Sequence, residues 1–219
     1  MTYFNLHSHS HSDHPDVTTV VNQYPWDFIP KIPVYSIGIH PWHIVEERLE
    51  SDIKTLKDKL ILDECIALGE CGLDKRIEVP LSIQIKVFET QIKLAQHYQK
   101  PLILHLVAAF QELSDIITRL QPTVPIIVHG FSKNTQVANQ MLQLGCYLSF
   151  GKYLLQNPEL KSTFKAVPLD RIFLETDTES NTIQEVYEVA ATYKEITVAQ
   201  LQQQINSNIQ TVFYKSRTK

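Results

Sequence analysis

Short apolar runs alternate with longer amphipathic stretches along most of the chain. The runs lie at residues 3–7, 17–21, 34–39, 65–70, 101–106, 125–130, 146–151 and 171–176. Several of them, such as "CIALGE" and "PLILHL", are almost continuously apolar. Such runs are typical of strands that are buried on both faces of a parallel sheet. The pattern therefore predicts eight parallel strands covered by helices.

The stretches between these runs carry apolar residues at spacings of three and four, which predicts amphipathic helices. The apolar stripes cover residues 45–60, 81–95, 110–120, 137–144, 160–167, 186–193 and 201–212. Pro80 stands where a helix can begin, and Gly145 stands where one can end. Eight strands that alternate with helices indicate an α/β fold of the (β/α)8 TIM-barrel type.

Two early connections contain no helical pattern. Residues 8–16 read "SHSHSDHPD", and residues 22–33 read "NQYPWDFIPKIP", with three prolines. A crossover between parallel strands usually needs a dozen or more residues and a helix. We therefore predict a distorted barrel whose first two helices are missing or replaced by loops. No repeat, low-complexity tract or linker divides the chain, so residues 1–219 are predicted to form one domain.

Composition narrows the class of protein. Hydrophobic residues make up 43% and charged residues 20% of the chain, as in ordinary soluble globular proteins. No apolar run approaches the roughly 18 residues of a membrane span, and no secretory signal is expected. The three cysteines form no CxxC pair, which indicates reduced, mostly buried thiols in a cytoplasmic protein. A net charge of −4 gives no basis for tight non-specific nucleic-acid binding, although a local basic strip is compatible with it.

Residues of the kinds that bind metals stand at the ends of five predicted strands. They are His7, His9, Glu70, His105, His129 and Asp177. Active sites of (β/α)8 barrels lie at the carboxyl ends of the strands, so we expect these side chains to meet at one mouth. Taken singly, each also fits a structural role, such as a helix cap at Asp177. Together, four imidazoles and two carboxylates suit Zn, Mn, Fe or Co, and Mg if binding is weak.

Several motifs resemble those of one known family. They are "NLHSH", "SIGIHPWH", "IALGECGLD", "PLILH", "PIIVHGFS" and "VPLDRIFLETD". In order and approximate spacing they resemble the TatD family of metal-dependent hydrolases, which lies within the amidohydrolase-like barrels. The resemblance runs from about residue 3 to residue 177, and "INSNIQTVF" near the end is similar to the closing helix of the family. Family members are commonly described as deoxyribonucleases that act at DNA ends, so the resemblance implies phosphodiester hydrolysis.

The resemblance also implies two divalent metal ions (Zn, Mn or Mg) and a role for each candidate ligand. His7 and His9 would bind one ion together with Asp177. Glu70 would bridge the two ions, and His105 and His129 would bind the second. Asp177 would also act as the base for the attacking water. DNA or a small phosphoester would be the substrate, with no membrane partner.

Three positions depart from the family pattern. Asn5 stands where the family usually has Asp, and Val107 stands where it usually has an Arg that would suit a substrate phosphate. The residues after "ETD" are "TESNT" instead of a proline-containing loop. We interpret Asn5 as a residue behind the ligands that tunes the site. The missing Arg weakens the case for DNA as substrate.

Other polar residues near the expected mouth have two interpretations each. His40 is a candidate contact for substrate phosphate, or it packs beside Trp42. Lys152, just past the seventh run, is a candidate positive charge for substrate, or it is solvated. His11 and His14 fall outside the matched motif and are interpreted as loop residues over the site.

Alternatives to a deoxyribonuclease remain open. The stretch "NLHSHSHSDH" also resembles the start of PHP-type phosphoesterases, which leaves a phosphomonoesterase open, although the later motifs "GECGLD" and "LETD" favour the resemblance to TatD. Related barrels hydrolyse amides or lactones with similar metals. A degenerate family member that binds metal without catalysis is the non-enzyme alternative, supported by Asn5 and Val107.

Overall fold

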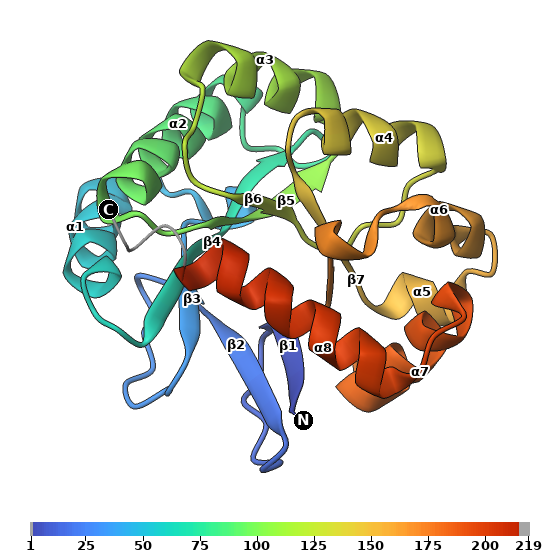
Figure 1. Cartoon of the computed structure of the whole chain (residues 1–219). Helices are drawn as coiled ribbons and strands as arrows, with labels where there is room; N and C mark the ends of the chain where they lie inside the picture. Colours follow the sequence, from blue (N-terminus) through green and yellow to red (C-terminus); the bar gives the residue numbers. More distant parts are fainter. Residues whose placement is uncertain (1, 215–219) are drawn as a thin grey trace. The chain divides into compact units, whose positions relative to one another are not determined.

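The computed structural model describes residues 2–214, and its elements alternate as predicted (Figure 1). The strands are β1 (Tyr3–Ser8), β2 (Val17–Gln23), β3 (Tyr35–Ile37), β4 (Cys65–Asp74), β5 (Leu102–Val107), β6 (Ile126–Val128), β7 (Tyr147–Phe150) and β8 (Ile172–Leu174). The eight strands lie in the sheet in chain order, and their recorded pairings are parallel. The predicted parallel α/β fold is confirmed.

The helices follow the amphipathic stripes. They are α1 (Leu49–Leu60), α2 (Leu81–Tyr98), α3 (Phe110–Leu120), α4 (Thr135–Gln143), α5 (Lys152–Gln156), α6 (Leu160–Ala166), α7 (Ile183–Lys194) and α8 (Val198–Ile209), with short turns η1 (Pro41–His43), η2 (Glu46–Arg48), η3 (Leu169–Arg171) and η4 (Gln210–Tyr214). Within residues 2–214, no helix lies between β1 and β2 or between β2 and β3. The prediction that loops replace the first two helices is confirmed. The five-residue α5 was not predicted.

The chain divides into two compact units. Unit 1 consists of Met1–Val21 and Ile127–Lys219, and unit 2 consists of Asn22–Ile126. The prediction that residues 1–219 form one domain stays a prediction. None of the described helices has the length and apolar character needed to cross a membrane. All three cysteines are buried and carry free thiols.

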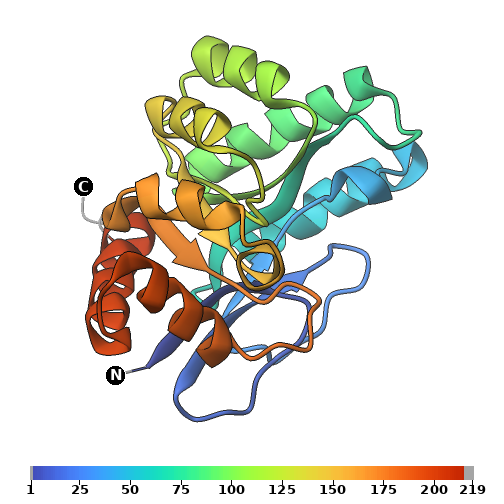
Figure 2. The same cartoon turned by 90° about the vertical axis from the view of Figure 1, so that its right-hand side faces the viewer.

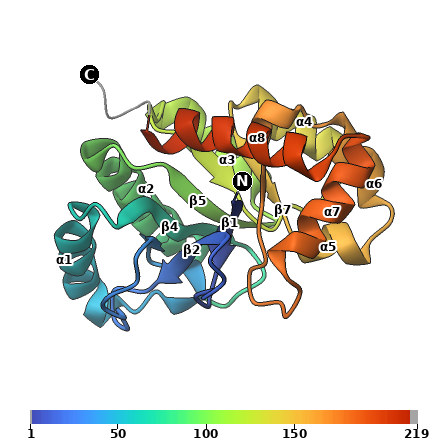
Figure 3. The same ribbon diagram turned by 60° about the horizontal axis from the view of Figure 1, so that its bottom comes forward.

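In unit 1, the ends of β1 and β8 are joined through the backbone. Asp177 donates its N–H to the carbonyl of His7 at 2.9 Å and accepts the N–H of His9 at 3.2 Å. Helices α7 and α8, coloured orange to red, pack against β1 and β8 (Figures 2 and 3). Both helices begin with a capping box, at Thr182 and Thr197, which satisfies N–H groups of the first turn. These contacts fix the strand ends from which candidate ligands project.

In unit 2, helix α2 holds the ends of β3 and β4 through two buried glutamines. Gln91 accepts the N–H of Ile39 at 2.8 Å and donates to its carbonyl at 3.1 Å. Gln84 accepts the N–H of Asp74 at 2.8 Å and donates to its carbonyl at 2.9 Å. Two turns of helix separate the glutamines, so both lie on the same face of α2. Each glutamine side chain therefore pairs with both the N–H and the C=O group of one backbone residue.

The close approach of β4 to β5 requires glycine at one position. Gly72 has φ +134°, and a Cβ atom there would lie 2.1 Å from the carbonyl oxygen of His105. The backbone of β5 leaves no space for it, so a side chain would push the strands apart. The glycine in "GECGLD" therefore sets the strand spacing beside His105.

Tyr187 on α7 provides a stability prediction in unit 1. Its hydroxyl accepts the N–H of Phe4 at 3.2 Å and donates to the carbonyl of Phe4 at 3.1 Å, and the residue is fully buried. Tyr187→Phe removes the partner of two buried backbone groups. We expect the free energy of unfolding to fall by about 1–3 kcal/mol, measured by urea denaturation.

Tyr193→Phe is the matched control on the same helix. Its hydroxyl has no hydrogen bond recorded within residues 2–214, and its ring is partly exposed. The control should leave the urea midpoint nearly unchanged. Equal effects of the two substitutions would contradict the assigned role of the Tyr187 hydroxyl.

Candidate metal sites

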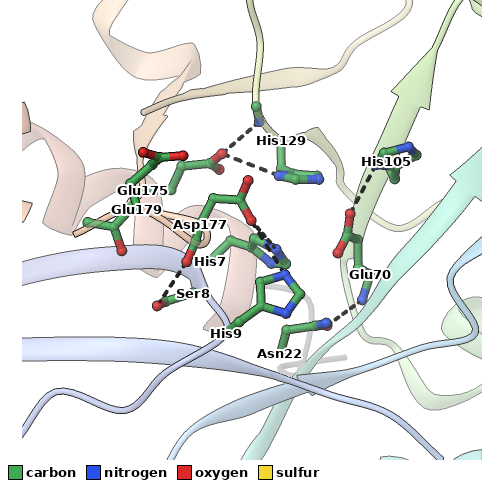
Figure 4. Close-up of polar contacts among 12 residues, drawn as sticks. His7, Ser8, His9, Asn22, Glu70, His105, His129, Glu175, Asp177 and Glu179 are labelled. Carbon is green, nitrogen blue, oxygen red and sulfur yellow. Dashed lines mark hydrogen bonds and ion pairs between the residues drawn. The ribbon is translucent and has the colours of Figure 1, made fainter. Parts of the chain in front are cut away.

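Unit 1 brings His7, His9 and Asp177 together (Figure 4). The two histidines lie on and just after β1, and Asp177 follows β8. Asp177 Oδ1 lies 3.4 Å from His9 Nε2 and 3.7 Å from His7 Nε2. One ligand atom from each residue lies within 4.8 Å of the others. Two imidazoles and a carboxylate at this spacing fit the donor set of a divalent transition metal.

His129 and Glu175 lie in the same unit. The ring centroids of His129 and His7 are 4.4 Å apart. Glu175 Oε1 lies 3.3 Å from His129 Nδ1 and accepts the N–H of Gly130 at 2.7 Å. A carboxylate that accepts from one ring nitrogen of a histidine makes the other nitrogen the metal ligand, so Glu175 would direct His129 Nε2 to a cation. Glu175 is itself buried.

Unit 2 brings His40, Glu70 and His105 together. Glu70 Oε1 lies 3.1 Å from both His40 Nε2 and His105 Nδ1. The backbone N–H of Glu70 donates to Asn22 Oδ1 at 2.8 Å (Figure 4). Glu70 and His105 lie within β4 and β5 and not at their ends, because the two strands continue to Asp74 and Val107. This group again combines imidazoles with a carboxylate, and it fits a divalent cation.

The protonation of His40 follows from its partners. His40 Nδ1 accepts the backbone N–H of Trp42 at 3.1 Å, so the proton of the neutral ring lies on Nε2, which faces Glu70. Burial lowers the pKa of His40, although the hydrogen bond and the charge of Glu70 oppose this effect. His40 is therefore a neutral imidazole near pH 7 and a candidate ligand beside Glu70.

Asp74 is a functional candidate that sequence reasoning did not identify. Its Oδ2 lies 3.0 Å from His105 Nε2 and accepts the indole N–H of Trp42 at 2.7 Å. Burial disfavours its charged form, but hydrogen bonds from His105, Trp42 and the backbone of Arg76 outweigh burial and lower its pKa. Asp74 thus holds one nitrogen of His105 while the other faces Glu70. The sequence feature that could have identified Asp74 is its spacing of four residues from Glu70, which places both side chains on the same side of a strand.

The remaining predicted residues lie as follows. Lys152, the first residue of α5, pairs with Glu179 Oε1 at 2.9 Å. This hydrogen bond to Glu179 raises the pKa of Lys152. His11 and His14 are exposed loop residues that belong to neither cluster of candidate ligands. Their proposed place over the site, the substrate roles of His40 and Lys152, and the bridging role of Glu70 stay predictions.

Asn5 lies behind the unit 1 ligands. It is buried, donates to Thr176 Oγ1 at 2.8 Å and accepts the N–H of Thr176 at 3.0 Å. Asn5 therefore fixes the residue that precedes Asp177. Val107 ends β5, and its carbonyl accepts the N–H of Lys75 at 3.1 Å.

Comparisons with known proteins agree on a family. The family model described as TatD related DNase matches residues 2–214. An uncharacterized metal-dependent hydrolase of Bacillus subtilis, YabD, is 32% identical over 75% of this chain and 65% of its own length. The 3'-5' ssDNA/RNA exonuclease TatD of Erwinia billingiae is 32% identical over 64% of this chain and 55% of its own length. The chain thus spans less than two thirds of these two relatives.

A human relative, the 3'-5' RNA nuclease TATDN2, is 31% identical over 65% of this chain and 19% of its own length. Among solved structures, the TatD homologue YJJV of Escherichia coli has a TM-score of 0.83 at 22% identity, covering 96% of this chain and 97% of its own. A TatD family hydrolase of Entamoeba histolytica has a TM-score of 0.81 at 16% identity, covering 97% and 98%. These structural likenesses confirm the predicted (β/α)8 TIM-barrel fold, and the family match over residues 2–214 shows that the chain belongs to the TatD related DNase family.

Proposed function

We propose that this chain is a metal-dependent phosphodiesterase that removes nucleotides from an end of single-stranded DNA or RNA. The observation that carries the proposal is the pair of imidazole and carboxylate clusters on strands or just after them, one in each unit. Nucleases appear by name among the relatives in two organisms, which supports a nucleic acid as substrate.

The two clusters would each hold a divalent cation (Zn, Mn or Mg). His7, His9 and Asp177, with His129 beside His7, supply the donors in unit 1. Glu70, His105 and His40 supply those in unit 2. When bound, a divalent cation supplies Lewis acidity, which makes water more acidic and offsets phosphate charge. Neutral imidazoles leave part of the cation charge available for the phosphate.

The protein's own groups perform the proton transfers. Asp177 accepts a proton from the water whose oxygen attacks phosphorus, since its carboxylate faces His7 and His9 and is partly exposed. The bond between phosphorus and the leaving ester oxygen breaks, and the proton that Asp177 took from the water passes to that oxygen. Lys152, half-buried and charged through its pairing with Glu179, would stabilise a phosphate oxygen.

Hydrolysis of end-labelled single-stranded DNA tests the proposal directly. With added Mg, Mn or Zn, we expect progressive shortening that EDTA stops. Asp177→Asn removes the proton acceptor, so we expect the rate to fall by about 10²–10⁴-fold. Intact DNA in wild-type protein that contains metal would refute nuclease activity and direct attention to small phosphoesters.

Metal content tests the ligand assignment. His7→Ala and Glu70→Ala each remove one donor, so we expect less metal per chain by elemental analysis after dialysis. His97→Ala is the control, because His97 is an exposed histidine on α2 outside both clusters. Full metal occupancy in both cluster variants would contradict the assignment.

Asp74→Asn tests whether Asp74 holds His105 in place. Loss of the carboxylate removes the charge behind His105 Nε2, and such changes typically cost about 10–100-fold in metal affinity or activity. Metal titration should show the weaker affinity, and Asp58→Asn, an exposed change on α1, should not. Unchanged affinity in Asp74→Asn would assign Asp74 a purely structural role.

A further inference from the structure

Trp42 is exposed and yet held in one orientation. It lies on η1, just after β3, and is 56% exposed. Its indole N–H donates to Asp74 Oδ2 at 2.7 Å, and its backbone N–H donates to His40 Nδ1 at 3.1 Å. A large apolar ring left in solvent is costly, and packing against the protein core would be the cheaper arrangement. The hydrogen bond to a buried carboxylate instead fixes the ring at the surface.

The ring also lies beside the unit 2 cluster of His40, Glu70 and His105. The Trp42 ring centroid is 5.3 Å from that of His40 and 5.7 Å from that of His105, both in T-shaped contact. His40 and His105 are the two histidines that flank Glu70. A planar group that stacked on Trp42 would therefore lie close to a phosphate bound at this cluster.

Asp74 also binds the backbone of a positively charged residue. Arg76 donates its backbone N–H to Asp74 Oδ1 at 2.9 Å, so Asp74 holds both Trp42 and Arg76. The Arg76 side chain is exposed and has no ion pair recorded within residues 2–214, whereas its neighbour Lys75 pairs with Glu112. Exposed aromatic rings combined with cations are the means by which proteins bind single-stranded nucleic acids.

We propose that Trp42 stacks on a base of a single-stranded nucleic acid and that Arg76 binds a backbone phosphate next to it. The inference rests on the proposed function, because the stacked nucleotide lies next to the phosphate that is hydrolysed. Arg76 would also supply a phosphate-binding charge in a chain that has Val107 where an arginine would suit this purpose. Every base has an aromatic face that can stack, so we expect this subsite to bind nucleotides without distinguishing among the bases.

A pair of substrates separates base stacking from phosphate binding. One is a single-stranded oligothymidylate, and the other has the same length but stable abasic residues at the cleaved end. Trp42→Ala should lower kcat/KM on the first by about 5- to 150-fold, mainly through KM, the range expected for loss of one stacked base. On the abasic substrate, Trp42→Ala should have no larger effect than Trp42→Phe, because both substitutions remove the indole N–H from Asp74.

Trp42→Phe keeps an aromatic ring but loses the indole N–H, so it should retain most of the activity on oligothymidylate. Ile61→Ala is the control in the same unit, because Ile61 is 66% exposed. It should change kcat/KM on neither substrate. Arg76→Ala should affect both substrates alike and reduce the slope of log kcat/KM against log salt by about one. Equal losses on both substrates in Trp42→Ala would overturn the stacking role.

Fluorescence provides a readout that does not require turnover. The chain has two tryptophans, so Trp26→Phe leaves Trp42 as the single reporter. A phosphorothioate oligothymidylate, which resists hydrolysis, should quench Trp42 with metal present, and the abasic analogue should not. Equal quenching, or none, would overturn the inference. If wild-type protein hydrolyses neither substrate, nuclease activity is refuted, while selective quenching would still establish base binding.

Discussion

The candidate site depends on carboxylates that are buried against imidazole rings. A buried charge is stable only when polar groups compensate for the water that it loses. Glu70 meets this requirement through His40 and His105, and Asp74 meets it through His105 and Trp42. In the absence of a cation these contacts stabilise the carboxylates, and the same atoms are the donors that a cation would use. The same contacts therefore stabilise the buried carboxylates in the folded protein and place the donors that a cation would need.

The same pairing of carboxylate and histidine occurs in each unit. Asp74 faces His105 in unit 2, and Glu175 faces His129 in unit 1. His105 lies within β5 and His129 follows β6, while their carboxylate partners end or follow another strand of the same unit, with Asp74 at the end of β4 and Glu175 just after β8. Each pair fixes the orientation of an imidazole ring, which increases its basicity as a ligand. Secondary contacts to the backbone, such as Gly130 to Glu175, hold the carboxylates in turn.

Periodicity in the sequence was sufficient to predict most elements but not the partners of the ligands. Strands such as β5 and helices such as α2 carry long, regular patterns, and they appear where expected. The five-residue α5 is too short to show a helical period. Asp74 and Glu175 were missed because their roles arise from contacts with histidines 31 and 46 positions away in the chain. Such pairings depend on strand register, which a single sequence does not display.

The substitution at Asn5 has a physical explanation in these contacts. Asn5 is buried and uses both ends of its amide on Thr176, one as donor and one as acceptor. An aspartate could accept from the Thr176 N–H and from its hydroxyl, but it would place a buried negative charge against the residue that precedes Asp177. Buried charges without a compensating partner are costly, whereas a fully hydrogen-bonded amide is not. Asparagine therefore preserves the position of the strand end and leaves Asp177 as the carboxylate that faces His7 and His9.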